Sequence, residues 1–158
     1  MSEIKLAADA MLGGLARWLR VLGVDVAYDP RWDDAELVER SLAEERTILT
    51  RDRRLILRRR ARRHLLIRSG DIGEQLAQVF AELGITPDPQ SYFGRCLRCN
   101  AALSPLAAES ATGRVPDYVT RTQREFRECP SCRRVYWPAT HVRRMRERLR
   151  ALGLGEPR

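Results

Sequence analysis

Apolar and polar residues in the first half of the chain follow two alternating periods. The apolar run 4–9 ends at Asp9, and leucines at helical spacing follow in 12–22, where Gly23 is placed to end a helix. A short apolar run followed by a longer amphipathic segment predicts a strand and then a helix.

The same two patterns recur before residue 85. Apolar runs predict strands at 24–29, 47–50 and 64–68, and helical spacing predicts helices at 33–45 and 70–84. Asp33 or Asp34 is placed to cap the first of these helices, and Asp71 with Glu74 has the capping-box spacing at the start of the second. The arginine-rich segment 51–63 is predicted to hold a basic helix. Strands that alternate with helices are typical of an α/β fold with a parallel sheet.

A segment of different character begins after this pattern ends. The stretch 87–94 contains two prolines and neither period, which predicts a linker. Past it lie paired cysteine motifs, a loosely composed stretch rich in alanine and serine, and a basic helix at 139–153. We therefore predict an α/β domain at 1–86, a linker at 87–94 and a small basic domain at 95–158.

The four cysteines form two Cys-x2-Cys motifs, Cys96 with Cys99 and Cys129 with Cys132. Two residues between thiolates allow a tight turn to aim both sulfurs at one point, and two such turns complete a tetrahedral zinc site. The 29 residues between the motifs exceed the usual ribbon spacing, so an insertion is predicted to loop out. Disulfides are the alternative. A closed four-thiolate site has no open position, so this zinc is predicted to be structural.

Positive charge is concentrated in the second half of the chain. The net charge is +8, and 28 of the 29 basic residues are arginine. Residues 1–90 hold 15 basic and 15 acidic residues, whereas 91–158 hold 14 basic and 6 acidic residues. This excess favours a polyanionic partner.

No apolar run approaches the roughly 18 to 20 residues that span a bilayer. The first residues carry acids early and lack the basic start and apolar block of a secretory signal. We therefore expect a cytoplasmic protein without a membrane partner. A reducing cytosol favours zinc over disulfides at the cysteines.

Aspartates stand at or just after the ends of the predicted strands. They are Asp9, Asp29, Asp52 and Asp71, with Asp33 and Asp34 at the start of the helix that follows the second strand. In an open parallel sheet, ligands bind beyond the carboxyl ends of the strands, so these side chains are predicted to converge. Carboxylates suit Mg²⁺, which generates hydroxide and stabilises charge during an in-line attack on phosphorus. Nearby arginines are suited to hold flanking phosphates.

Structural roles also account for several of these acids. Asp33 and Asp71 fit helix caps, and Asp29 fits a turn. Asp52 lies inside a dense block of arginines, where a surface ion pair is the alternative to a catalytic role. Asp9 ends an apolar strand before a helix, where a carboxylate has no obvious structural need.

The two histidines and one arginine of the first helix have separate interpretations. His141, near the start of the basic C-terminal helix, is a candidate phosphate contact, active-site group or further zinc ligand, with a cap or surface position as the alternative. His64 opens a predicted strand and is assigned a structural role. Arg17 lies close in sequence to Asp9 and is predicted to face the same site, whereas most arginines are expected to form a solvated face.

Five motifs in this order resemble a known family. They are DAMLGGLARWLRVLG at 9–23, DDAELVERSLAEERTILTRDRRL at 33–55, RCLRCN at 95–100, CPSC at 129–132 and VYWPATH at 135–141. Together they are similar to the Mut-seven C-terminal RNase family, PIN-like ribonucleases fused to a zinc ribbon. The resemblance implies a PIN-like parallel sheet flanked by helices, a nuclease site dependent on Mg²⁺ or Mn²⁺, and a C-terminal ribbon that helps to hold RNA.

Carried over to this sequence, the resemblance assigns Asp9, Asp34 and Asp52 as catalytic ligands of the Mg²⁺ or Mn²⁺ ion. Asp52 is then the acid of a T-x-D motif. The basic residues predicted to contact RNA are Arg17, Arg51, Arg53, His141, Arg143 and Arg144. Typical PIN domains are longer and carry another acid, usually a glutamate in a middle helix, with no clear counterpart here.

Three functions follow from these observations. The first is a metal-dependent ribonuclease whose basic zinc ribbon holds the RNA backbone. The second is a non-catalytic RNA- or ribosome-binding module that keeps the fold without the chemistry. The third, a DNA-binding regulator with a zinc ribbon, is disfavoured because the chain shows no clear recognition helix.

Overall fold

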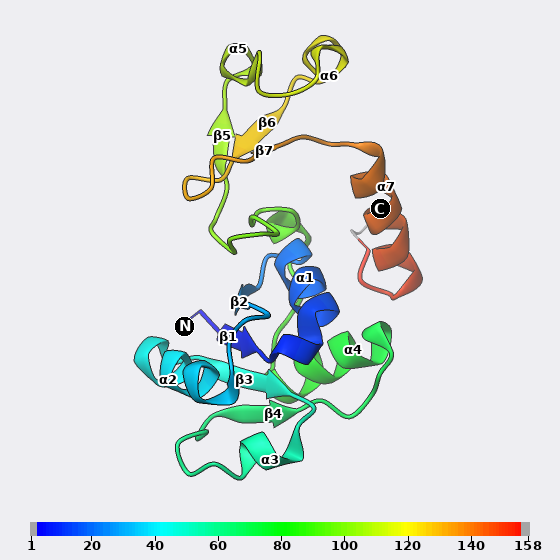
Figure 1. The fold of residues 1–158 in the computed structure, drawn as a ribbon. Helices are drawn as coiled ribbons and strands as arrows, with labels where there is room; N and C mark the ends of the chain where they lie inside the picture. The colour runs from blue at the N-terminus through cyan, green and yellow to red at the C-terminus, as the bar shows by residue number, and fades with distance from the viewer. Residues whose placement is uncertain (1–2, 156–158) are drawn as a thin grey trace. The chain divides into compact units, whose positions relative to one another are not determined.

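The computed structural model describes residues 3–155, which form two compact units divided between Phe93 and Gly94 (Figure 1). The first unit contains strands β1 (Lys5–Ala8), β2 (Asp25–Ala27), β3 (Thr47–Thr50) and β4 (His64–Leu66). They form a parallel sheet in the order β2-β1-β3-β4. The predicted α/β fold with a parallel sheet is confirmed.

The helices of the first unit lie between these strands and after the last of them. They are η1 (Ala10–Leu12), α1 (Gly13–Val21), α2 (Asp34–Glu44), α3 (Arg53–Ile56), α4 (Ile72–Leu83) and η2 (Pro89–Ser91). Asp33 and Asp71 cap α2 and α4 as predicted, since their carboxylates accept hydrogen bonds from the N–H groups of Glu36 and Glu74. The basic helix expected within 51–63 is a single turn, α3.

Alternating strand residues form two cores, one on each face of the sheet. Ala7 and Ile48 face α2 and α3, where they pack with Leu37, Val38 and Leu55. On the other face, α1 packs against α4 and against β1 and β2 (Figure 1). Burial on both faces explains why the central strands read as uninterrupted apolar runs.

Gly23 ends α1 as predicted and also accommodates a close contact. Its φ of +83° lies in the region that favours glycine, and an added Cβ would lie 2.5 Å from the carbonyl oxygen of Ser91. Phe93 N donates to the Val21 carbonyl oxygen at 2.7 Å. The segment around η2, within the expected linker 87–94, therefore packs against the end of α1 inside the first unit.

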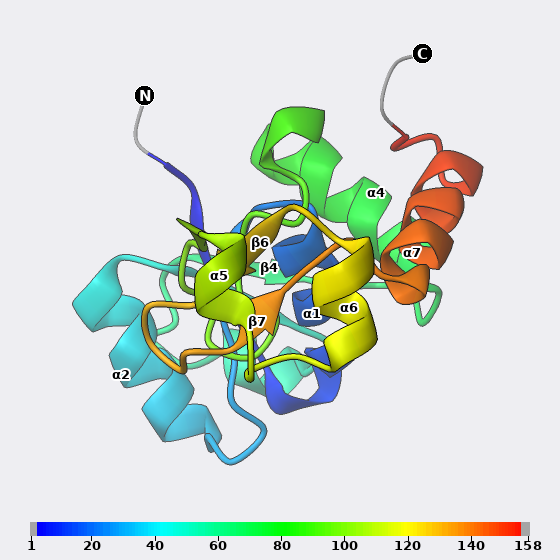
Figure 2. The same ribbon diagram turned by 90° about the horizontal axis from the view of Figure 1, so that it is seen from above.

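The second unit contains a small antiparallel sheet of order β5-β6-β7. Its elements are β5 (Ser104–Leu106), α5 (Ala108–Ala111), α6 (Asp117–Thr122), β6 (Phe126–Glu128), β7 (Val135–Tyr136) and α7 (Thr140–Ala151). Helices α5 and α6 lie side by side at one end of this sheet (Figures 1 and 2). They enclose a core of Ala111, Val115, Val119 and Phe126. The segment between the cysteine motifs is therefore an ordered part with a core of its own.

In residues 3–155, no helix combines the length and the apolar character needed to cross a membrane.

Candidate functional site

The strand order of the first unit reverses its direction between β1 and β3. The chain passes from β1 to β2 on one side and later returns to place β3 on the other side of β1. Connections that leave neighbouring parallel strands in opposite directions open a crevice at their carboxyl ends, where ligands bind in open α/β sheets. Asp9 directly follows β1, and Thr50 ends β3.

A buried hydroxyl joins the two aspartates at this crevice. Thr50 is fully buried, and its Oγ1 donates to Asp9 Oδ2 at 2.7 Å. The same Oγ1 accepts a hydrogen bond from Asp52 N at 2.9 Å. Because a hydroxyl has a single proton, which Asp9 receives here, the direction of both bonds is fixed. The structure therefore brings Asp9 and Asp52 together through Thr50, a residue that the sequence analysis did not assign to the site.

Asp52 is a helix cap and not a surface ion pair. Its Oδ1 accepts from Arg54 N at 2.8 Å at the start of α3. Within the described residues, Asp52 forms no ion pair, although arginines surround it in sequence. Two of these arginines pair elsewhere, Arg58 with Asp34 and Arg60 with Glu39. The ion-pair interpretation of Asp52 is therefore wrong.

The other acids at this edge of the sheet have separate contacts. Asp34 is the first residue of α2, and its Oδ2 lies 3.6 Å from Arg58 Nη2, outside the hydrogen-bond network of Thr50. Asp29 accepts from Arg31 N and pairs with the Arg31 guanidinium, which lowers the pKa of Asp29 to about 2. Asp29 is thus a turn residue with its own cation.

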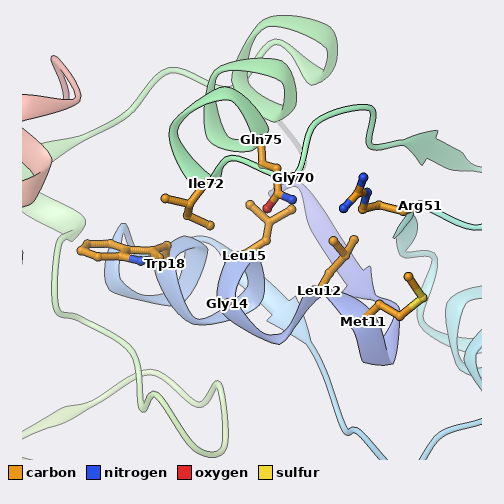
Figure 3. Close-up of a pocket in the computed structure, with 9 residues that line it drawn as sticks. All are labelled: Met11, Leu12, Gly14, Leu15, Trp18, Arg51, Gly70, Ile72 and Gln75. Atoms are coloured by element: carbon orange, nitrogen blue, oxygen red, sulfur yellow. The ribbon is translucent and has the colours of Figure 1, made fainter.

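The arginines predicted to bind RNA in the first unit are solvent-exposed. Arg17, Arg51 and Arg53 form no hydrogen bond or ion pair through their side chains in the part of the chain that the structure describes. Arg51 stands between Thr50 and Asp52, and its guanidinium passes over Gly70 in the loop before α4. It lines a pocket of about 360 Å³ between η1, α1 and the start of α4 (Figure 3).

The second unit gathers the four cysteines into one cluster. Within residues 3–155, Cys96, Cys99, Cys129 and Cys132 are the one group of three or more Cys, His, Asp or Glu residues placed to hold a metal ion, and their sulfurs lie within 4.8 Å of one another. All four are free thiols, so the disulfide alternative is wrong. His141 is not part of this cluster, so its interpretation as a further ligand is also wrong.

The two cysteine turns have the same local geometry. The N–H of the second cysteine donates to the sulfur of the first, Cys99 N to Cys96 Sγ at 3.3 Å and Cys132 N to Cys129 Sγ at 3.4 Å. The next residue, Asn100 or Arg133, has a positive φ. Cys96 Sγ and Cys132 Sγ are 3.7 Å apart. Tetrahedral zinc with Zn–S bonds of about 2.3 Å needs sulfurs roughly 3.8 Å apart, so the site fits zinc.

Tyr136 supports the first cysteine turn from β7. Its hydroxyl lies 3.1 Å from Cys96 Sγ and accepts from Leu97 N at 3.1 Å. Burial raises the pKa of the Cys96 thiol, but hydrogen bonds from Tyr136 and from backbone N–H groups outweigh it and lower this pKa to about 7. Burial and the neighbouring sulfurs raise the pKa of Cys99 to about 12. The cluster therefore favours a thiolate at Cys96, the form that binds zinc.

The remaining predicted residues lie on separate elements. His141, Arg143 and Arg144 are exposed on α7. His64 Nδ1 lies 2.7 Å from the carbonyl oxygen of Ala61, which confirms its structural role because the ring must donate to a carbonyl.

Comparison with known families gives one match that spans both units. The Mut7-C RNAse domain matches residues 4–149, whereas no curated protein and no solved structure matches the chain. The matched range contains the Asp9–Thr50–Asp52 network and all four cysteines. Because this match covers nearly the whole sequence, the chain belongs to the Mut7-C RNAse domain family.

Proposed function

We propose that this protein is a ribonuclease that hydrolyses RNA phosphodiester bonds with Mg²⁺ or Mn²⁺ held by Asp9, Asp34 and Asp52. The family match supports the ribonuclease class. The observation that carries the metal-dependent mechanism is the network of Asp9, Thr50 and Asp52 at the crevice between β1 and β3.

The oxygen donors at this crevice suit a hard cation. In the described part of the chain, Asp9 Oδ1 and Asp52 Oδ2 accept no hydrogen bond, and neither carboxylate pairs with an arginine. Mg²⁺ in phosphoryl-transfer sites uses one or two carboxylates, waters and substrate phosphates, so two such acids form the core of a site. When bound, the ion supplies a hydroxide nucleophile and stabilises charge on the attacked phosphate.

The residues around the acids hold and orient the reacting groups. Thr50 fixes the carboxylate of Asp9 and the backbone of Asp52 before substrate binds, which reduces the reorganisation needed for catalysis. Arg51 and Arg53 flank Asp52 and are exposed, so their guanidinium groups are free to bind phosphates on either side of the cleaved bond. Arg17 on α1 extends this basic surface.

The second unit would bind RNA without taking part in the chemistry. Four cysteines would close the coordination sphere of a structural zinc. Strand β7 follows the second cysteine motif and precedes α7, so the zinc site would fix the start of the chain segment that leads to this helix. His141, Arg143 and Arg144 on α7 would contact the RNA backbone. We place the protein in the cytoplasm, where thiols stay reduced and available to zinc.

One observation favours a non-catalytic RNA- or ribosome-binding module as the second candidate. Asp34 is held 3.6 Å from Arg58, outside the network that joins the other two acids. A site that uses only two of its three acids would bind an ion more weakly. This candidate keeps the basic surfaces and loses the hydrolysis.

Cleavage of labelled single-stranded RNA separates the two candidates. We expect purified protein to cleave RNA with Mn²⁺ or Mg²⁺ and not with a chelator, and we expect Asp9→Asn and Asp52→Asn to abolish cleavage. Asp88→Asn is a matched control, because Asp88 caps η2 through the same contact to the N–H two residues later. RNA binding without metal-dependent cleavage over varied sequences supports the binding module instead.

A further inference from the structure

The pocket that Arg51 lines in the first unit combines apolar side chains with two polar ones, Arg51 and Gln75. Met11, Leu15 and Trp18 line it from η1 and α1, and Ile72 lines it from the start of α4 (Figure 3). Its volume is about 360 Å³. Met11 is one of the few large apolar side chains exposed in the described residues. Among these residues, the indole of Trp18 offers the flat apolar face that suits an aromatic ring.

Gln75 presents a hydrogen-bond acceptor to this pocket. Gln75 is only 6% exposed. Its Nε2 donates to the Ser69 carbonyl oxygen at 2.8 Å. A carbonyl oxygen only accepts, so the amide nitrogen must face Ser69 and Oε1 must face away. Within residues 3–155, no donor reaches this Oε1. Figure 3 shows the amide of Gln75 directed into the pocket above Leu15.

Arg51 gives the pocket a cationic end that adjoins the acids. Its guanidinium lies 3.5 Å from the position of a Cβ on Gly70 and has no protein partner in the described chain. Asp9 immediately precedes η1, whose Met11 and Leu12 line the pocket, and Asp52 immediately follows Arg51. A nucleotide whose phosphate lies beside the acids can therefore place its base in the pocket.

We propose that this pocket binds a nucleobase of single-stranded RNA next to the phosphate that is cleaved. Gln75 Oε1 accepts from an N–H group of the base, Trp18 and Ile72 contact its faces, and Arg51 holds its phosphate. A base inside a duplex is stacked and paired, so only an unpaired nucleotide enters. The inference rests on the proposed ribonuclease function and adds a binding place for the base of the nucleotide next to the cleaved phosphate.

Gly14 allows the pocket to be filled without disturbing the fold. It lies on α1 at the pocket, and a Cβ added there meets no atom within 4 Å. Gly14→Leu therefore places a side chain in the space for the base, whereas Gly14→Ala leaves most of that space open. Both variants replace glycine in a helix by a better helix former, so both are expected to fold.

Binding of nucleotides tests the pocket without relying on catalysis. We expect adenosine 5′-monophosphate to bind the full chain about tenfold more tightly than ribose 5-phosphate, which lacks the base, as measured by calorimetry. Gly14→Ala keeps this difference and Gly14→Leu removes it. Purine riboside 5′-monophosphate, whose base has no N–H donor, binds more weakly than the adenosine nucleotide. Equal binding of the adenosine nucleotide and ribose 5-phosphate, or an unchanged preference in Gly14→Leu, overturns the proposal.

A single abasic nucleotide in an RNA substrate separates this inference from the proposed function. Cleavage next to the abasic position is expected to slow about tenfold in the original protein and not in Gly14→Leu, which is slow on both substrates. Cleavage that ignores the missing base overturns the pocket and leaves the ribonuclease intact. Base-dependent nucleotide binding without any RNA cleavage supports the pocket and removes the ribonuclease.

Discussion

Replacing Thr50 by valine tests the network that joins the two aspartates. Valine has nearly the shape of threonine but no hydroxyl, so Thr50→Val removes the 2.7 Å bond to Asp9 and the 2.9 Å bond from Asp52 N. Thr50 is fully buried, and Asp9 is only 8% exposed. Water therefore replaces the lost hydroxyl only in part.

The expected loss of stability follows from these two bonds. A bond to a charged acceptor contributes about 1.5–3 kcal/mol and a neutral one about 0.5–1.5 kcal/mol. Because the partial exposure of Asp9 recovers some of this through water, we expect Thr50→Val to lower the free energy of unfolding by about 2–4 kcal/mol. Thr50→Ser is the matched control, because it keeps the hydroxyl and loses one buried methyl group, at about 1 kcal/mol.

Two measurements check this reasoning. Urea denaturation without added Mg²⁺ or Mn²⁺ gives the free energy of unfolding of each variant. Cleavage rates at increasing Mn²⁺ concentration give the apparent affinity for this ion. Loss of an outer-shell partner typically weakens metal binding by about 10–100-fold, which we expect for Thr50→Val and not for Thr50→Ser. A valine variant with the stability and the Mn²⁺ dependence of the original protein would refute the role given to Thr50.

Three further changes test the fold and the zinc site. Gly13→Ala is expected to lower the free energy of unfolding by about 1–2 kcal/mol, because its Cβ would lie 2.6 Å from the Tyr28 hydroxyl. Gly14→Ala, whose Cβ meets no atom within 4 Å, is expected to raise the free energy of unfolding by about 0.5–1 kcal/mol. Equal melting temperatures of the two variants would contradict this reasoning. Arg46→Ala is expected to lower the free energy of unfolding, measured by urea denaturation, by about 3–5 kcal/mol, because it removes the guanidinium that lies 2.7 Å from the partly buried Asp25 carboxylate. A loss below about 1 kcal/mol would contradict this prediction. Elemental analysis should find one zinc per chain after purification under reducing conditions. Cys129→Ser should lower the zinc content while the first unit keeps its melting temperature. Protein purified in this way without zinc would exclude a structural zinc at the four cysteines.

The strands and helices of the first unit were predictable because each carries its own local signal. The apolar runs mark strands buried on both faces, and Asp33, Asp71 and Gly84 stand at the helix ends that their side chains or backbone favour. Helices α5 and α6 were missed because a helix of four or six residues is too short to show a period in sequence.

Most arginines are exposed as predicted, and two of them are exceptions. Arg20 and Arg46 are buried. Arg20 Nε donates to the Val26 carbonyl oxygen at 2.9 Å, and Arg46 bridges Asp25 and the Leu6 carbonyl oxygen. Arg20 reaches from α1 to the backbone of β2, and Arg46 reaches the backbone of β1, so both roles depend on tertiary contacts that no local pattern reveals.

Strand register explains why the acids of the site were predictable and their partner was not. Apolar runs place Asp9 and Asp52 near the ends of strands, but only the pairing of β1 with β3 decides what lies opposite them. Ala8 pairs with Leu49, so the next positions, Asp9 and Thr50, stand level at the edge of the sheet. A slip of one residue would turn the Thr50 hydroxyl to the opposite face. The site therefore depends on the sheet core, since the burial of Ala7 and Ile48 on one face fixes this register and with it the hydrogen bond that orients Asp9.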